Sequence, residues 1–343
     1  MKPKAFALLA WCLVVCLTTT ASSAKNLVGY QVVDFKLPGA VRPLTSAVWY
    51  PTRVRPRLYC YGGPSSGWVA LNAQPDQGGP YPLLVFSHGY AGSGLGALFM
   101  TEALASRGWI VVAPDHHDRF SAARIRAGAV TDVDGQGLRR HALEIAASGP
   151  EKRDEYSYRL DEMKAALDGI LSHPTLGPLV DRRRIAIGGH SFGGFTALGL
   201  CGPLPERRDS RVKALLLFST GAGGYLYRED ELKAVKIPCM CFLGEAEREQ
   251  KRGNKTMVEL TRKIYACLSP PKYLVEVQGA DHFSFNNRFS DTLGARRMSG
   301  SEEQFQIIRR YSIAFLEKYL GAGDAAGVLM RQGPGLSDFR KKL

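Results

Sequence analysis

The chain has 343 residues, of which 45% are hydrophobic and 22% are charged. These fractions are those of a globular protein with a full core, and they exclude a chain that is disordered overall. Its 37 glycines and 19 prolines exclude the collagen-like and low-complexity classes. The net charge of +13 is compatible with nucleic-acid binding, with attraction to an anionic surface, or with a basic exported protein.

The first 24 residues have the three parts of a secretory signal peptide. Lys2 and Lys4 form a basic start, an apolar run over 5–17 follows, and a small polar stretch ends at Ala24. The run is shorter than the roughly 20 residues that cross a bilayer, so an uncleaved anchor is the less favoured alternative. We predict removal of 1–24 and a secreted or periplasmic protein. The leader holds two lysines and no acid, so its removal lowers the net charge to +11.

The cysteines and histidines give no metal-binding pattern. There is no Cys-x-x-Cys pair, and the adjacent His116 and His117 would point to opposite faces of a strand. No metal and no cofactor are therefore predicted. An oxidising compartment would permit up to two disulfides, and buried thiols are the alternative. The cysteines left after the leader are Cys60, Cys201, Cys239, Cys241 and Cys267.

Short apolar runs along the chain predict buried β-strands, and segments with helical spacing lie between them. Ser301 and Gln304 form a capping box for a final helix. Strands come first and then alternate with helices, which predicts one doubly wound α/β domain. We expect a mostly parallel sheet of about eight strands with helices on both faces. The predicted strands are 29–35, 44–50, 83–86, 109–113, 185–188, 214–218, 239–243 and 273–277, and the other predicted helices are 98–106, 160–171, 195–201 and 257–268.

Three segments do not fit this alternation. Residues 53–80 are rich in glycine and proline and are predicted to be a loop. Residues 120–149 are polar and are predicted to be an insertion with a short helix. The domain is expected to cover 25–322, and 323–343 to be a loose C-terminal tail.

One motif predicts chemistry. Gly-His-Ser-Phe-Gly over 189–193 lies between a predicted strand and a predicted helix, which is the context of a nucleophile elbow. The strand must turn sharply into the helix, so small neighbours at Gly189 and Gly193 leave room for the approach. Ser191 would then project from the helix N-terminus as a catalytic nucleophile. A glycine-rich turn without reactivity is the alternative.

A serine nucleophile needs a base and an acid, which follow it along the chain in this kind of site. His282 is the only histidine after Ser191, and it comes just past the last predicted strand. The acid is expected after the strand 239–243, where Glu245 and Glu247 both occur. Its role would be to hold the imidazole tautomer and to stabilise the imidazolium.

Two backbone N–H groups must face the charge that develops on the substrate. One is expected from Phe192, the residue after the nucleophile. The other is expected from the loop after strand 83–86, where Gly89 permits close approach and Tyr90 is the predicted donor. A purely packing role for the Tyr90 ring is the alternative.

With these motifs, the chain resembles the α/β-hydrolases, and among them the platelet-activating factor acetylhydrolases and predicted dienelactone hydrolases. The resemblance extends over about 28–320 and implies a serine esterase. Four stretches carry it: Val48-Trp49-Tyr50-Pro51-Thr52, Val85-Phe86-Ser87-His88-Gly89, His116-His117-Asp118-Arg119-Phe120-Ser121-Ala122, and 181–194.

The resemblance has departures. The acetylhydrolases place their acid after the strand that matches 214–218, where this chain has Ser219-Thr220-Gly221 and no carboxylate. Glu247 instead resembles the acid of bacterial cutinases and polyester hydrolases, so it is the predicted acid and Glu245 the alternative. Gly89-Tyr90 has the same resemblance. Dienelactone hydrolases proper use a cysteine nucleophile, whereas this chain has Ser191.

We therefore expect an exported serine hydrolase that cleaves short acyl or lipid esters through an acyl-enzyme. A cutinase-like polyester hydrolase and a non-catalytic binding protein on a hydrolase scaffold are the alternatives. No nucleic-acid partner is predicted, because the basic residues are scattered without a motif. The net positive charge favours weak association with an anionic surface. The oligomeric state does not follow from the sequence.

Overall fold

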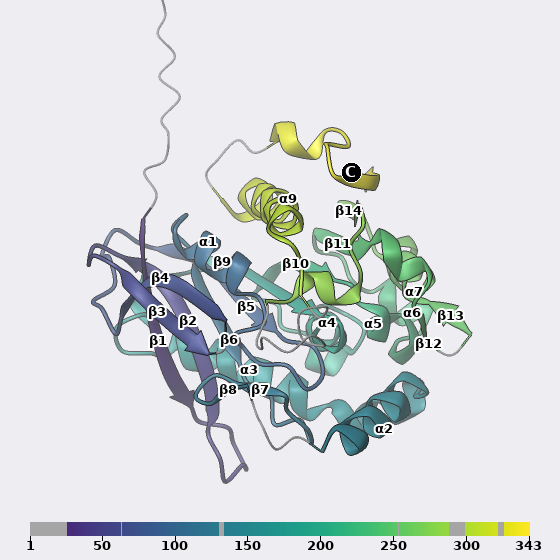
Figure 1. The fold of residues 1–343 in the computed structure, drawn as a ribbon, viewed down its shortest axis with the longest axis horizontal. Helices are drawn as coiled ribbons and strands as arrows, with labels where there is room; N and C mark the ends of the chain where they lie inside the picture. Colours follow the sequence, from purple (N-terminus) through teal and green to yellow (C-terminus); the bar gives the residue numbers. More distant parts are fainter. Residues whose placement is uncertain (1–25, 63, 130–133, 253, 288–298, 322–325) are drawn as a thin grey trace, which may run out of the picture.

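The computed structural model describes residues 26–62, 64–129, 134–252, 254–287, 299–321 and 326–343 (Figure 1). The predicted signal peptide lies outside these residues. None of the helices within the described ranges has the length and apolarity needed to cross a membrane.

The centre of the fold is an 11-stranded sheet in the order β15-β14-β11-β10-β9-β5-β6-β2-β1-β4-β3. Strands β14 to β6 in this order run parallel to one another, so their carboxyl ends meet at one edge. β2 pairs antiparallel with both β6 and β1. The strands are β1 (Leu27–Phe35), β2 (Leu44–Thr52), β3 (Arg57–Gly62), β4 (Ser65–Leu71), β5 (Tyr81–Ser87), β6 (Ile110–Pro114), β9 (Val180–His190), β10 (Val212–Phe218), β11 (Cys239–Gly244), β14 (Lys272–Val277) and β15 (Leu336–Lys342).

Helices cover both faces of this sheet. α3, α4, α5 and α7 pack on one face, and α1 and α9 pack on the other, where Phe99 and Phe305 stack with ring centroids 4.2 Å apart. α2 lies beyond the carboxyl ends of the strands near α3 (Figure 1). The helices are α1 (Leu98–Ala105), α2 (Gly135–Ala146), α3 (Tyr158–Leu171), α4 (Phe192–Gly199), α5 (Gly221–Leu226), α6 (Glu229–Leu232), α7 (Met257–Cys267) and α9 (Glu302–Leu320).

The pleat of β5 explains why its sequence is apolar throughout. Leu83 and Val85 belong to the core under α3 and α4, whereas Leu84 and Phe86 belong to the core under α1 and α9. Each such fully buried side chain contributes about 1.5–3 kcal/mol. The doubly wound, mostly parallel sheet is therefore confirmed, and the capping box at Ser301 is confirmed as the start of α9.

The sheet has more strands than the eight that the sequence predicts. The predicted loop 53–80 contains the hairpin β3–β4, and the hairpin continues the sheet because β4 pairs parallel with β1. The prediction was wrong because the strands are short and glycine and serine interrupt the apolar pattern of β4. Two small two-stranded sheets lie outside this sheet. They are β7 (Ala123–Arg124) with β8 (Gly128–Ala129), and β12 (Lys251–Arg252) with β13 (Lys255–Thr256).

The end of the chain is also more ordered than the predicted tail. Residues 336–342 form β15, which pairs antiparallel with β14 along the sheet edge. Phe339 lies on the rings of Tyr273 and Tyr311, with centroids 6.5 and 5.7 Å apart. The charged residues of this segment suggest a solvated tail, but charges are also common on edge strands, where they prevent further pairing.

Three of the cysteines are buried in the core as thiols. Cys239 and Cys241 lie on the same face of β11 with their sulfurs 3.9 Å apart, and Cys201 is buried at the end of α4. Burial raises the pKa of the Cys201 thiol above its ordinary value, so this thiol stays protonated and unreactive. For these three residues the structure agrees with the alternative of buried thiols.

Candidate active site

Ser191 lies at the turn between β9 and α4. Its backbone has φ 54° and ψ −117°, a region that residues other than glycine rarely adopt. The neighbouring glycines are required because other backbone atoms approach them closely. A Cβ on Gly189 would lie 2.1 Å from the Gly193 carbonyl oxygen, and a Cβ on Gly193 would lie 2.1 Å from the Ser87 carbonyl oxygen. The structure thus has the strand, sharp turn and helix that the motif predicts, with Ser191 half-buried at the strand ends.

Two other predicted residues come from neighbouring strands at the same edge. Glu247 lies in the short helix η4 (Glu245–Arg248) after β11, and it is fully buried. His282 begins the short helix η5 (His282–Phe285) after β14 and is 6% exposed. Because β9, β11 and β14 are parallel, their carboxyl ends bring all three predicted residues to one place.

A serine hydroxyl links the two. Ser219 Oγ donates to Glu247 Oε2 at 2.7 Å and lies 2.5 Å from His282 Nδ1. Since the hydroxyl proton points to the carboxylate, the Nδ1–H of His282 is the donor to Ser219 Oγ. The hydrogen of the neutral imidazole is therefore on Nδ1, which leaves Nε2 unprotonated and able to accept a proton. The other oxygen of Glu247 accepts the Gly244 N–H at 2.7 Å.

Sequence reasoning did not give Ser219 a role. It directly follows β10 at the same sheet edge, and that position was noted only because it lacks a carboxylate. Its backbone has φ 46°, and its side chain is fully buried. The sequence signal that could have found it is its place at the end of a parallel strand next to the nucleophile strand.

The competing carboxylates point elsewhere. Glu245 Oε2 accepts the Gly279 N–H at 2.9 Å, in the turn after β14. Asp281 caps η5 by accepting the N–H groups of Phe283 and Ser284 at 2.9 and 3.0 Å. Both side chains are thus engaged with backbone of the loop that carries His282.

His190, the residue before Ser191, holds the backbone of the candidate base. Its Nε2–H donates to the His282 carbonyl at 2.9 Å. Burial lowers the pKa of His190 to about 4, so it is neutral at physiological pH. Gln250 supports the same segment from the other side, because its Oε1 accepts the His282 N–H at 3.2 Å. The position of His282 is therefore fixed through its own main chain.

The predicted oxyanion donors lie side by side. Phe192 is the first residue of α4, so its N–H belongs to the helix end that has no partner within the helix. Tyr90 is half-buried, and its ring meets the Phe192 ring edge-on with centroids 6.0 Å apart. The Tyr90 hydroxyl bonds Nδ1 of His141 on α2. Tyr90 thus connects Phe192, the residue after Ser191, with α2.

A second alignment of serine, histidine and acid lies beneath this loop. Ser87 Oγ is 2.7 Å from His116 Nε2, and His116 Nδ1 is 2.7 Å from Glu162 Oε2. All three are at most 1% exposed, so no substrate reaches Ser87. The array instead supports the start of the loop that carries Tyr90, the predicted oxyanion donor.

This array corrects one expectation. His116 and His117 were expected to face opposite sides of a strand. They follow β6, which ends at Pro114, and both ring Nδ1 atoms contact Glu162, at 2.7 and 2.9 Å. Outside a strand, neighbouring side chains are free to converge on one partner.

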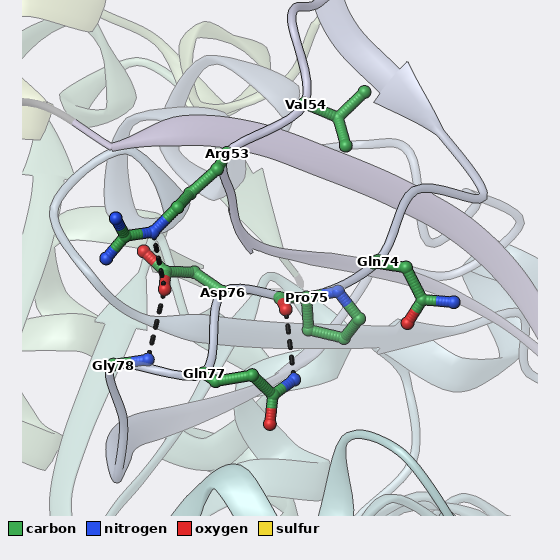
Figure 2. A pocket seen from close by; sticks show the side chains of 7 residues that line it. All are labelled: Arg53, Val54, Gln74, Pro75, Asp76, Gln77 and Gly78. Carbon is green, nitrogen blue, oxygen red and sulfur yellow. Dashed lines mark hydrogen bonds and ion pairs between the residues drawn. The ribbon is translucent and has the colours of Figure 1, made fainter.

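A surface pocket lies far from this site (Figure 2). It is lined by the segments after β2 and before β5, at the amino ends of the parallel strands and hence at the opposite edge of the sheet. The Arg53–Asp76 ion pair (3.0 Å) crosses it, and the Arg53 side chain is 83% exposed. An exposed pair of this kind contributes little stability. The lining residues are Arg53, Val54, Gln74, Pro75, Asp76, Gln77 and Gly78.

Known proteins with similar sequences include platelet-activating factor acetylhydrolases. The model of the family "platelet-activating factor acetylhydrolase, isoform II" matches residues 60–173. The platelet-activating factor acetylhydrolase of Cavia porcellus is 27% identical over 281 residues, which cover 73% of this chain and 60% of the relative. The chain is similar to the platelet-activating factor acetylhydrolases. The resemblance inferred from the sequence motifs is thereby confirmed, although the matched part spans only about 60% of these relatives.

Other relatives carry related names. Lipase 1 of Moraxella sp. is 29% identical over 142 residues, or 41% of this chain and 39% of the lipase. A solved ferulic acid esterase of Streptomyces cinnamoneus superposes with a TM-score of 0.66 at 20% identity, covering 93% of this chain and 95% of the esterase. The α/β-hydrolase fold is therefore confirmed. In this chain Ser219, and no carboxylate, occupies the position after β10.

Proposed function

We propose that this acetylhydrolase-like chain is an exported carboxylic ester hydrolase with Ser191 as nucleophile, His282 as base and Glu247 as acid. The proposal is supported chiefly by one observation. A serine in a strained turn at a helix N-terminus lies at the strand edge where a buried carboxylate and hydroxyl orient a histidine. This is the arrangement that serine hydrolysis requires, because it activates the hydroxyl and fixes the tautomer of the base.

The reaction runs in two halves. His282 Nε2 takes the Ser191 proton as Oγ attacks the ester carbonyl, and the carbonyl oxygen becomes an oxyanion that the N–H groups of Tyr90 and Phe192 stabilise. The tetrahedral intermediate expels the alcohol, which takes the proton from His282. Water then repeats the sequence on the acyl-enzyme, and the acid leaves with Ser191 restored. Ser219 and Glu247 stabilise the imidazolium in both halves.

The mechanism is tested with p-nitrophenyl acetate. Wild type is expected to show a burst of p-nitrophenol followed by steady turnover, and Ser191→Ala is expected to lose both. A fluorophosphonate should label wild type on Ser191 alone. A matched control is Ser312→Ala, which changes a buried serine on α9 that bonds no other group in the described structure. Equal rates for wild type and Ser191→Ala would refute the mechanism.

The substrate class is proposed to be short acyl or lipid esters, as the names of the acetylhydrolase relatives indicate for those proteins. A cutinase-like polyester hydrolase is the second candidate, because the carboxylate lies after β11 and Tyr90 forms the oxyanion loop. A panel of p-nitrophenyl esters of increasing chain length, run beside a polyester emulsion, separates the two. Clearing of the emulsion would favour the second candidate, and turnover confined to soluble esters the first.

Export and surface attraction complete the proposal. The leader 1–24 and the charge of +11 that remains favour an exported protein drawn weakly to anionic surfaces. N-terminal sequencing of the exported protein is expected to begin at Lys25. Binding to anionic vesicles is expected to weaken as salt is added, since exposed charges are screened over roughly 10 Å at 0.1 M salt.

A further inference from the structure

A buried ion pair lies directly beneath the oxyanion loop. Arg159 on α3 and Asp118 after β6 both have fully buried side chains. Arg159 Nε and Nη2 donate to the two Asp118 oxygens at 2.8 and 2.5 Å, which is the two-pronged geometry of a strong pair. Removing two charges from water costs several kcal/mol per ion, so such a pair persists only where it is fully hydrogen-bonded.

The remaining bonds of this pair go to one short segment. Arg159 Nη1 donates to the His88 carbonyl at 2.8 Å, and Nη2 approaches the Gly89 carbonyl at 3.4 Å. Asp118 Oδ2 accepts the Ala91 N–H at 3.1 Å. The ion pair therefore holds the loop on both sides of Tyr90, whose N–H is the proposed oxyanion donor.

The geometry of the Gly89–Tyr90 peptide sets the direction of the Tyr90 N–H. The Gly89 carbonyl and the Tyr90 N–H belong to the same peptide unit, and in a trans peptide these two groups point in opposite directions. Inward bonds hold the Gly89 carbonyl, from Arg159 and also from His88 Nδ1 at 2.6 Å. The Tyr90 N–H must consequently point outward, away from the ion pair.

The same guanidinium also supports the other donor. Arg159 Cζ lies 4.8 Å from the centroid of the Phe192 ring. A guanidinium over an aromatic ring is attracted to it and fixes its plane. One side chain thus contacts the carbonyl of the peptide that carries the Tyr90 N–H and also the ring of Phe192.

We propose that Arg159, paired with Asp118, is the positioning residue of the oxyanion hole: it aims the Tyr90 N–H and holds it in register with Phe192. The inference rests on the proposed ester hydrolysis and extends it to a residue that touches no substrate. The donors that Arg159 aims meet full negative charge only in the transition state. Loss of Arg159 should therefore lower kcat and leave KM nearly unchanged.

The test variant is Arg159→Lys, which keeps the buried charge and loses the fork that bonds Asp118 and the loop together. Loss of a whole oxyanion donor costs about 10²–10³ in kcat. A misaimed donor should cost roughly 10- to 100-fold, with KM within about threefold of wild type. The inhibition constant of phenylboronic acid, which forms a tetrahedral adduct on Ser191, should rise by the same factor as kcat falls.

The matched control is Arg153→Lys. Arg153 also pairs with a carboxylate, because its Nη1 donates to both Glu231 oxygens at 2.7 Å, and it also lies near an aromatic ring, that of Tyr227. It bonds no residue of 88–91, so its variant should keep the kinetics and the boronate affinity of wild type. Equal losses in both lysine variants would overturn the inference, because they would reflect the fold and not the oxyanion loop.

A milder variant serves if Arg159→Lys does not fold. Tyr158→Phe removes only the hydroxyl that donates to Asp118 Oδ1 at 2.7 Å, and it should lower kcat and weaken boronate binding in step by twofold to tenfold. Unchanged boronate affinity in a folded variant would overturn the inference alone. Wild type that neither turns over p-nitrophenyl acetate nor takes the fluorophosphonate label would overturn the proposed function and this inference with it.

Discussion

Ser219→Ala isolates the hydroxyl that bridges the base and the acid. In the proposed mechanism Glu247 neither gains nor loses a proton, whereas His282 gains its charge as Ser191 attacks. The bond that strengthens in the transition state is therefore the 2.5 Å contact between Ser219 Oγ and His282 Nδ1. A hydrogen bond to a charged group is worth about 1.5–3 kcal/mol. At about 1.4 kcal/mol per factor of ten, its loss should lower kcat roughly 10- to 150-fold.

The assay is p-nitrophenyl acetate hydrolysis, with thermal unfolding measured in parallel. KM should change little, because the hydroxyl does not touch substrate. Ser219→Ala combined with Glu247→Gln should be much less than additive, since both changes break one chain of bonds. Ser312→Ala is again the buried-serine control. A folded Ser219→Ala with kcat within twofold of wild type would refute the reasoning.

Three further results are expected. Glu247→Gln should lower kcat by about 10³- to 10⁴-fold, whereas Glu245→Gln should leave kcat within twofold; collapse of the second variant alone would make Glu245 the acid. Burial raises the pKa of Glu102 from 4.5 to about 7. The free energy of unfolding therefore falls as pH rises from about 4.5 to 7, because the folded state must give up a proton that the unfolded chain has already lost. Glu102→Gln should therefore match wild type below about pH 4.5 and exceed it by up to about 3 kcal/mol at pH 8 in urea unfolding; a gain only at low pH would contradict this. Truncation before Leu336 exposes the edge of β14, so the urea midpoint should fall and aggregation should rise, and an unchanged midpoint would show that β15 contributes nothing.

The sequence predicted the parallel core well because its strands are apolar on both sides. Leu83–Phe86 and its neighbours meet a helical layer on each face, so their continuous apolar runs identify them without any tertiary information. β3 and β15 are the edge strands and β4 lies next to β3, in the outer part of the sheet where glycine, serine and charged residues are tolerated. Their membership in the sheet depends on pairing partners far away in sequence, which local pattern does not record.

The site shows the same division. Ser191 was predictable because the elbow imposes its glycines locally, and His282 because no other histidine follows it. The choice between two glutamates depended on resemblance alone until the strand ends were in place. The Arg159–Asp118 and Ser219–His282 contacts join residues 41 and 63 positions apart, so no spacing rule could have assigned them.

The backbone around the site has a consequence for engineering. Among the residues that the structure describes, the non-glycine residues with positive φ are Asn72, Ala91, Ser191 and Ser219. The last three belong to the proposed oxyanion loop, the proposed nucleophile and the proposed bridge to the acid. A left-handed conformation costs a side chain roughly 1–2 kcal/mol, so the fold holds these three against their own preference. Ser191→Gly should relieve the cost of the positive φ at this position and yield a more heat-resistant, inactive protein. Selection for heat resistance alone would therefore tend to erode this site, and a screen for stable variants needs an activity filter.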